Sequence, residues 1–207
     1  MTARTAGAYR VTGSRQEFTG KILSVRVDRV LMSDGTVAER EVVAHPGAVG
    51  VVALDDTGQV VLVNQYRHPV RSRLDELPAG LLDVAGEPAL AAAQRELAEE
   101  ARLQAATWHV LVDLYTSPGM SDEAIRIFLA RDLRPVADGG AAFVAEAEEL
   151  TLTVHRVPLE RAVAGALSGE ITNAACVAGV LAAAHACDRG WSTLRPADAP
   201  WPARPGR

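Results

Sequence analysis

The chain is poor in cysteine and in aromatic residues. Its 207 residues include two cysteines, and phenylalanine, tryptophan and tyrosine together make up 4%. Cys176 and Cys187 lie in one segment that is predicted to be helical, eleven positions apart, which corresponds to about 16 Å of helical rise. Because this distance is too long for a mutual disulfide, the sequence argues against a fold held by disulfides, and we expect two buried free thiols.

The chain also lacks an excess of positive charge and a long apolar run. Its 21 lysine and arginine residues face 26 aspartate and glutamate residues, and the formal net charge of −5 argues against a nucleic-acid partner. The longest apolar stretch, residues 174–186, is too short for a membrane span. Residues 1–7 lack the apolar core of a signal peptide. We therefore expect a soluble cytoplasmic protein with no membrane partner.

Other absences narrow the choice of chemistry. The sequence contains no internal repeat, no dinucleotide-binding glycine fingerprint, no P-loop and no cysteine–histidine metal cluster. Its hydrophobic content of 48% is ample for a core, and its length fits one medium domain with a small extension.

Alternating apolar residues and turn signals predict a mixed α/β protein. The sequences Ser-Asp-Gly-Thr at 33–36 and Asp-Asp-Thr-Gly at 55–58 indicate two hairpin turns. We expect strands at residues 22–32, 37–44, 50–54, 59–66, 74–77, 108–117, 123–133 and 150–154, and helices at 88–102, 159–167 and 172–188. Residues 1–20, the loop 138–145 and the proline-rich tail from 190 are expected to be irregular. Such an arrangement predicts an α/β/α sandwich around a mixed sheet, preceded by a small antiparallel β element.

The most informative stretch is Arg-Glu-Leu-Ala-Glu-Glu at residues 95–100. On a helix, Glu96, Glu99 and Glu100 share one face. Like charges at such a short distance repel one another. Arg95 can neutralise one carboxylate, and the others suit a hard divalent cation, which prefers oxygen ligands. The alternative is a solvated acidic helix face without a metal.

The context of this helix resembles the Nudix box. Gly80 and a spacer lead to Glu87, and after seven more residues comes Arg-Glu-Leu-Ala-Glu-Glu-Ala-Arg-Leu at 95–103. Two features depart from the family pattern: the spacer at 81–86 has six residues where five are usual, and Arg102 stands at the usual glycine position. A glycine there adopts the left-handed conformation that ends a helix, which costs arginine about 1 kcal/mol.

The resemblance implies a Nudix-type fold and a metal site. It implies a Nudix hydrolase domain at residues 47–190 that binds Mg²⁺, with Mn²⁺ as an alternative. The implied ligands are Glu96 and Glu100, then Glu99, and the main-chain carbonyl of Ala79. The role of Glu87 stays open because of the longer spacer.

A second acidic cluster comprises Glu146, Glu148 and Glu149. By itself it is typical of a solvated strand entry. In Nudix enzymes that hydrolyse ADP-ribose, a glutamate on a loop here activates water, and a catalytic base must reach that water. Glu149 is the first choice because it directly precedes a predicted strand, and Glu148 and Glu146 stay open.

Further residues resemble the ADP-ribose pyrophosphatase subfamily. Pro118 lies sixteen residues beyond Arg102, a spacing associated with that subfamily, in a loop that also contains Met120. Arg67 and Arg73 are candidates to bind phosphate, since a guanidinium can bind phosphate oxygens with two hydrogen bonds. Glu76 is a candidate acceptor for adenine or ribose. Surface salt bridges are the alternative for Arg67, Arg73 and Glu76.

Taken together, these features predict Mg²⁺-dependent hydrolysis of ADP-ribose to AMP and ribose 5-phosphate. One alternative is a Nudix hydrolase of another nucleoside diphosphate derivative, such as a nucleotide sugar, NADH or a dinucleoside polyphosphate. A second is a non-catalytic ADP-ribose-sensing regulator, against which the intact glutamates and the acidic charge argue. Residues 1–46 are expected to form a β element for homodimerisation, and 191–207 a proline-rich tail.

Overall fold

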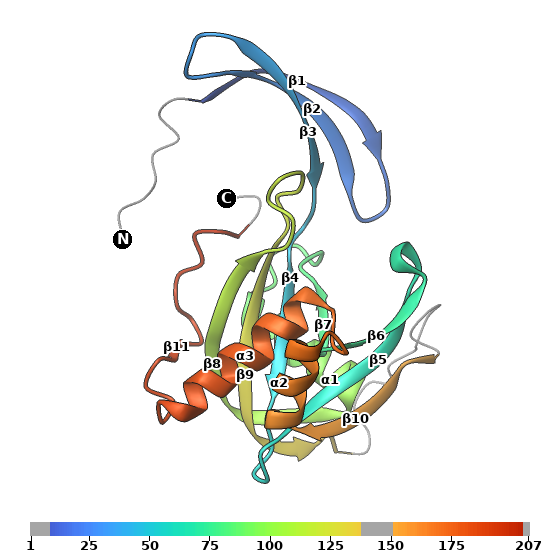
Figure 1. The fold of residues 1–207 in the computed structure, drawn as a ribbon, viewed down its shortest axis with the longest axis vertical. Coiled ribbons are helices and arrows are strands. Elements are labelled where there is room, and N and C mark those ends of the chain that lie inside the picture. The colour runs from blue at the N-terminus through green and yellow to red at the C-terminus, as the bar shows by residue number, and fades with distance from the viewer. Residues whose placement is uncertain (1–8, 138–150, 205–207) are drawn as a thin grey trace.

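The computed structural model describes residues 9–137 and 151–204, which form three β-sheets and three α-helices (Figure 1). The elements follow in the order β1 (Arg10–Thr19), β2 (Ser24–Leu31), β3 (Val37–Ala44), β4 (Ala48–Ala53), β5 (Gln59–Arg67), a 3₁₀ turn (His68–Val70), β6 (Ser72–Glu76), β7 (Ala79–Leu81), α1 (Ala89–Ala101), β8 (Leu103–Tyr115), β9 (Ala124–Pro135), β10 (Thr153–Pro158), α2 (Leu159–Ser168), α3 (Ala174–Asp188) and β11 (Arg195–Pro196).

The central sheet is mixed, as predicted. Its strand order is β11-β8-β9-β4-β7, with β4 parallel to β9 and the other neighbours antiparallel. A second sheet, β10-β5-β6, lies beside it. Helix α1 packs on one side of these sheets, and α2 and α3 pack on the other (Figure 1). The α/β/α sandwich is therefore confirmed.

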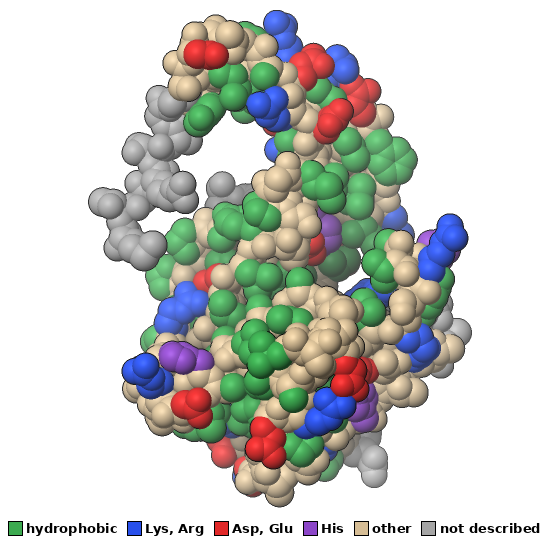
Figure 2. Space-filling model, in the orientation of Figure 1, with side chains coloured by type: hydrophobic (Ala, Val, Ile, Leu, Met, Phe, Trp, Pro, Cys, Tyr) green, Lys and Arg blue, Asp and Glu red, His purple; other side chains and the backbone are tan. Residues whose placement is uncertain are grey.

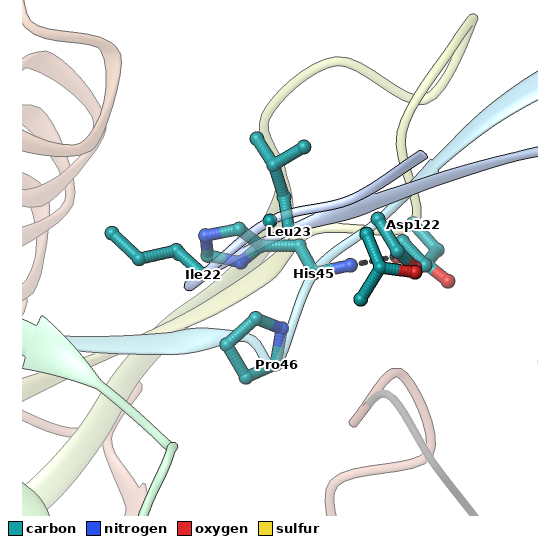
Figure 3. Close-up of a pocket in the computed structure, with 9 residues that line it drawn as sticks. Ile22, Leu23, His45, Pro46 and Asp122 are labelled. Carbon is teal, nitrogen blue, oxygen red and sulfur yellow. Dashed lines mark hydrogen bonds between the residues drawn. The ribbon is translucent and has the colours of Figure 1, made fainter. Parts of the chain in front are cut away.

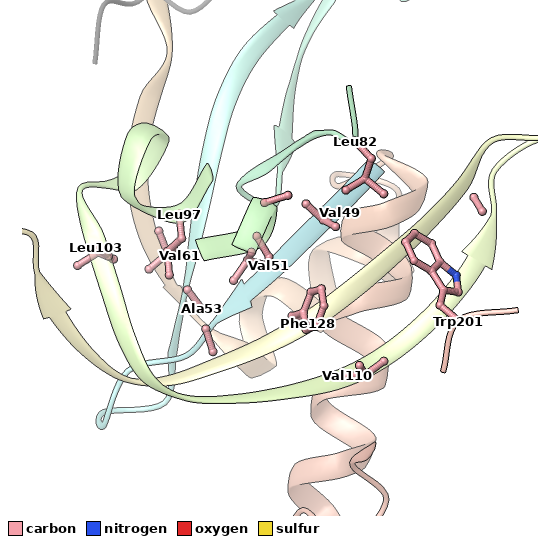
Figure 4. Close-up of a cluster of buried hydrophobic side chains, with 14 residues drawn as sticks. Val49, Val51, Ala53, Val61, Leu82, Leu97, Leu103, Val110, Phe128 and Trp201 are labelled. Atoms are coloured by element: carbon pink, nitrogen blue, oxygen red, sulfur yellow. The ribbon is translucent and has the colours of Figure 1, made fainter. Parts of the chain in front are cut away.

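The core has two layers because side chains alternate along the central strands. On β4, Val49 and Val51 face α1, whereas Val52 faces α3. On β9, Phe128 joins the α1 side and Ile127 joins the α3 side. Figure 4 shows the α1-side cluster, which also contains Leu97 of the helix and Trp201 near the C-terminus.

The predicted hairpin at residues 50–66 is wrong in one respect. The turn forms as expected, and Oδ1 of Asp55 accepts hydrogen bonds from the amides of Thr57 and Gln59. Beyond one bridge between Leu54 and Val60, however, β4 and β5 diverge into different sheets. Every residue of β4 is buried, since it lies between β9 and β7 in the middle of the sandwich.

The N-terminal element has three strands where the sequence predicted two. Residues 1–20 were expected to be irregular, but β1 pairs with β2 along its whole length, and β3 pairs with the other edge of β2. Strand β1 is almost entirely exposed, so it lacks the apolar alternation that would have revealed it. Its backbone pairing with β2 holds it in place.

The C-terminal segment also differs from the prediction of an irregular tail. Strand β11 pairs with β8, and Trp201 is only 4% exposed in the α1-side core. Arg126 is buried beneath this segment, and its guanidinium lies 4.9 Å from the centre of the Trp201 ring. The sequence did not predict this packing, because the segment is polar and rich in proline and one tryptophan, Trp201, anchors it in the core.

Both cysteines lie on α3 and are free, as predicted. Cys176 is buried, and burial raises the pKa of its thiol to about 12. Cys187 is exposed, so the prediction that both thiols are buried is wrong for this residue. Within the described ranges, the helices are too short or too polar to cross a membrane.

The close approach of α3 to the sheet depends on Gly179. A Cβ at this position would lie 2.8 Å from Cδ1 of Leu77 and 3.1 Å from Cγ2 of Val52. We therefore expect Gly179→Ala to lower the free energy of unfolding by about 1–3 kcal/mol through overpacking, as measured by urea denaturation. Gly13→Ala is the control, since its Cβ would meet nothing closer than 4.0 Å. Equal stability of both variants would contradict the prediction.

Candidate active site

Helix α1 brings the glutamates of the motif together next to its buried face, and Glu96 and Glu100 lie against β7. Ala92, Ala93 and Leu97 pack into the core. The helix begins after Pro88, which occupies the N-cap position, and ends at Arg102. Arg102 adopts φ 56° and ψ 35°, and its amide donates to the carbonyl of Leu97. The left-handed conformation expected at this position is thus present, with arginine in place of glycine.

Arg95 is the centre of the carboxylate cluster. Its Nη1 donates to Oε1 of Glu96 at 2.6 Å and to Oε2 of Glu99 at 3.0 Å. Its Nε and Nη2 each donate to Glu87, at 3.2 Å. Sequence reasoning assigned Arg95 to one carboxylate, but in the structure it binds three.

The cluster carries more negative than positive charge, since three carboxylates share one guanidinium. Burial raises the pKa of Glu96, although the charge of Arg95 opposes this shift. The hydrogen bond to Glu87 is the main reason that the pKa of Arg95 is raised above its ordinary value. The arrangement therefore favours a further cation.

Strand β7 lies directly against these carboxylates. The amide of Ala79 donates to Oε2 of Glu100 at 3.0 Å. At Gly80, a Cβ would lie 2.0 Å from Oε1 of Glu96, so only glycine leaves room for that carboxylate. Ala79, Glu96, Glu99 and Glu100, the predicted metal ligands, thus lie where α1 meets β7.

The donor atoms of this cluster suit Mg²⁺ or Mn²⁺, because carboxylate and main-chain oxygens are the ligands of hard cations. The space beside Gly80 accommodates the Glu96 carboxylate next to the strand that carries Ala79. Within residues 9–137 and 151–204, no three His, Cys, Asp or Glu side chains are grouped closely enough to hold a metal ion by themselves. Glu96 and Glu99 instead converge on Arg95.

The predicted substrate residues Arg67 and Glu76 bind each other. Nε and Nη2 of Arg67 donate to the two carboxylate oxygens of Glu76, at 2.9 and 2.6 Å, and Gln65 donates to the same carboxylate. Glu76 is only 2% exposed. In the described structure the two side chains thus form a salt bridge, with Glu76 buried and Arg67 partly exposed.

Arg73 lies on the other face of the β5–β6 pair. In the register it is opposite Tyr66, whereas Glu76 is opposite Val63, and alternate residues of a strand face opposite ways. Arg73 donates to the side chain and carbonyl of Asn64 and to the carbonyl of Thr151. The structure does not bring Arg67 and Arg73 together.

The loop with Pro118 and Met120 joins β8 to β9 and is tied to the N-terminal sheet. The amide of Val43 donates to the carbonyl of Met120 at 2.8 Å, and the amide of Asp122 donates back to the carbonyl of Val43 at 3.2 Å. The Met120 side chain is 60% exposed. This connection was not foreseen, because no local signal links residues so far apart in sequence.

A cavity of about 480 Å³ lies beside this connection (Figure 3). Oδ1 of Asp122 accepts a hydrogen bond from the amide of His45 at its wall. The cavity is lined by residues of the β1–β2 turn, the β3–β4 linker and the β8–β9 loop: Thr19, Gly20, Ile22, Leu23, Ser24, Ala44, His45, Pro46 and Asp122. None of these residues belongs to α1, so the cavity is separate from the carboxylate cluster.

The candidate bases Glu146, Glu148 and Glu149 lie outside the described residues. Thr151, the first described residue after them, is held by Arg73.

Comparison with known sequences identifies the family. Residues 44–173 match the NUDIX domain, and residues 9–43 match the nucleoside diphosphate sugar hydrolase N-terminal domain. The chain belongs to the Nudix family. It is a diphosphohydrolase by this membership.

Two relatives and one solved structure extend the comparison. The chain is 48% identical to an ADP-ribose pyrophosphatase of Mycobacterium tuberculosis (strain ATCC 25618 / H37Rv), over 95% of this chain and 93% of that protein. It is 39% identical to an ADP-ribose pyrophosphatase of Bacillus subtilis (strain 168), over 60% of this chain and 66% of that protein. A crystal structure described as an ADP compounds hydrolase has the same fold, with a TM-score of 0.73 and 22% identity, over 91% of this chain and 99% of that one.

The contact between β7 and α1 predicts a strong effect of Gly80→Ala. The added methyl group would displace the Glu96 carboxylate, and a displacement of about 1 Å at a catalytic group can reduce kcat on the order of 10²-fold. Steady-state hydrolysis assays would measure the loss, with circular dichroism to verify folding. The control is Gly50→Ala on the paired strand β4, whose Cβ would make ordinary contacts of 3.7 and 3.8 Å. Undiminished turnover in Gly80→Ala would contradict the assignment of Glu96 to the site.

Proposed function

We propose that the protein hydrolyses ADP-ribose to AMP and ribose 5-phosphate in a reaction that depends on Mg²⁺, with Mn²⁺ as a substitute. The observation that carries the proposal is the 48% identity to an ADP-ribose pyrophosphatase over 93% of that protein's length. The carboxylate cluster of Glu87, Glu96 and Glu99 around Arg95 supports it, since a diphosphate substrate is itself anionic and needs a cation to approach.

In this proposal Glu96, Glu99, Glu100 and the carbonyl of Ala79 hold the metal. A divalent ion bound there would offset the substrate's charge and stabilise the charge that develops in an in-line displacement at phosphorus. The protein's own part is positional. Arg95 keeps Glu96 and Glu99 from separating, and the β7 backbone orients Glu100 and leaves room for Glu96.

The other proposed roles follow the subfamily resemblance. Glu149 is the proposed base that takes a proton from the attacking water, with Glu148 or Glu146 as alternatives. Arg67 is the proposed phosphate contact on the α1 side of the sheet, and it would have to share or leave Glu76 to act. Arg73 on β6, and Pro118 and Met120 in the loop between β8 and β9, are also proposed to contact substrate.

Hydrolysis of a nucleoside diphosphate sugar is the second candidate function. The match of residues 9–43 to the N-terminal domain of nucleoside diphosphate sugar hydrolases favours it. Both reactions cleave a diphosphate, so the same carboxylates would serve. They differ in the sugar and the base that the protein must bind.

We also propose a homodimer in which residues 1–46 form the contact, beside a hydrolase domain at 47–190 and a tail at 191–207. The N-terminal sheet stands apart from the sandwich (Figure 1) and exposes apolar side chains, including Phe18 at 56%, Val11 and Ile22. Figure 2 shows apolar side chains among charged ones on this sheet. The independent stability of a three-stranded sheet depends on an apolar face, and a twofold contact would cover this surface on both chains.

A substrate panel tests the function. With Mg²⁺, we expect the highest kcat/KM for ADP-ribose among ADP-ribose, nucleotide sugars, NADH and dinucleoside polyphosphates at equal concentration, with AMP and ribose 5-phosphate as products identified by chromatography. Excess chelator should abolish turnover, and Glu96→Gln should lower kcat on the order of 10²-fold or more. Faster turnover of a nucleotide sugar would assign the second function instead. Full activity in chelator would refute the metal site.

Light scattering tests the dimer. We expect the full-length protein to have the mass of two chains at micromolar concentration, and Phe18→Glu to shift it toward one chain because a charge would be buried in the contact. The matched control is Leu167→Glu on α2, an equally apolar side chain that is more exposed and lies away from the N-terminal sheet. A full-length protein with the mass of one chain would refute the dimer and leave the glutamate site untouched.

A further inference from the structure

The segment 195–204, which we call the C-terminal strap, runs from the edge of the central sheet to the loop that carries Glu87. It starts as β11 on the edge of β8. It ends at Arg204, whose Nη2 donates to the main-chain carbonyl of Glu87 at 3.2 Å. The strap lies wholly outside residues 44–173, which match the NUDIX domain. The strap is therefore an addition to the family domain, and it contacts the spacer that carries Glu87.

Buried ionic contacts hold the first part of the strap. Arg126, which is buried on β9, donates twice to Asp113, and Arg195 donates to the same carboxylate at 2.8 Å. Two further N–H groups of Arg126 donate to the carbonyls of Ala199 at 2.6 Å and Pro200 at 3.0 Å. A guanidinium has several donors in a rigid plane, so this one residue ties the strap to the sheet at several points.

Trp201 holds the second part. Its side chain is buried in the α1-side core together with Leu82, which belongs to the spacer between β7 and α1 (Figure 4). Ala203 packs against the same core, and the amide of Arg204 donates to the carbonyl of Trp201 at 3.2 Å. Arg204 therefore extends from an anchored tryptophan and not from a free chain end.

The contact at Glu87 leads directly into the carboxylate cluster. The Glu87 side chain binds Nε and Nη2 of Arg95, which leaves Nη1 of Arg95 to bind Glu96 and Glu99. The spacer that carries Glu87 is one residue longer than usual in the family and contains Gly86 at φ 79°. Such a spacer has more conformations open to it. The amide of Glu87 donates to the carbonyl of Val84 within the spacer, and the contact from Arg204 adds a restraint from outside the spacer.

We propose that Arg204 is a positioning residue for the hydrolytic reaction: anchored by Trp201, it fixes the Glu87 main chain and thereby the orientation of Arg95 among the metal-binding glutamates. This inference rests on the proposed function. Arg204 does not touch the metal or the substrate. It acts through Glu87 and Arg95, so its loss should affect metal affinity more than folding.

The experiment compares Arg204→Ala, Arg204→Lys and the control Arg161→Ala in the full-length protein. Arg161 is an exposed arginine in the first turn of α2. It pairs with Glu170, which follows the end of that helix, away from the cluster. Binding of Mn²⁺ alone is measured by electron paramagnetic resonance without substrate. Hydrogen exchange of residues 82–88 is measured on the metal-free protein, and the melting temperature is recorded for each variant.

For Arg204→Ala we expect the Kd for Mn²⁺ to rise about three- to tenfold. This is at or below the lower limit of what loss of a direct partner of a metal ligand costs, because Arg204 acts through Glu87 and Arg95. Exchange at residues 82–88 should be faster, and saturating Mn²⁺ should restore most of kcat. Arg204→Lys, which keeps a donor, should recover much of the affinity. Arg161→Ala should match the wild type, and the melting temperatures should agree within about 2 °C.

Wild-type Mn²⁺ affinity and wild-type exchange in Arg204→Ala would overturn the proposal. A loss of affinity that appears equally in Arg204→Lys and accompanies a lower melting temperature would also overturn it, because it would indicate a general defect in folding. The proposed function is judged separately, by the turnover of ADP-ribose in the wild type. The exchange of residues 82–88 reports on the strap whether or not that turnover is found.

Discussion

The site depends on one ionic interaction, the contact of Arg95 with three carboxylates. Glu96, Glu99 and Glu87 would repel one another if they converged without a cation between them. Arg95 joins two of them from the same helix to a third from the preceding spacer. The excess of negative charge that is left makes the cluster receptive to a divalent cation. Loss of Arg95 would leave partly buried carboxylates unpaired, which costs more than the pair contributes.

The rest of the fold brings backbone and support to this cluster. Strand β7 supplies the amide of Ala79, which binds Glu100, and Gly80, whose missing side chain leaves room for Glu96. Its partner β4 holds β7 in position, because β4 is buried in the middle of the central sheet. Leu97 anchors α1 in the α1-side core, and Trp201 is buried in the same core. One apolar layer therefore fixes both the glutamate helix and the segment that reaches Glu87.

Local patterns predicted most elements correctly and failed where distant segments decide. The spacing of Glu96, Glu99 and Glu100 was enough to place them on one helix face, and the turn at 55–58 formed as its residues indicate. The pairing of β4 and β5 was wrong, since short turns favour hairpins but the sandwich separates these strands. Strand β1 was missed because both of its faces are exposed.

The sequence by itself determined that three glutamates and an arginine share one helix, which follows from residue type and helical period. The left-handed end at Arg102 was expected from the resemblance to the Nudix box, which has glycine there. Only the tertiary structure decided which charges meet. The bonds of Arg95 to Glu87, of Arg67 to Glu76 and of Arg204 to the Glu87 carbonyl join residues 8, 9 and 117 positions apart. No periodic pattern in the sequence predicts such contacts, because they form only when the packed layers bring residues of different segments close together.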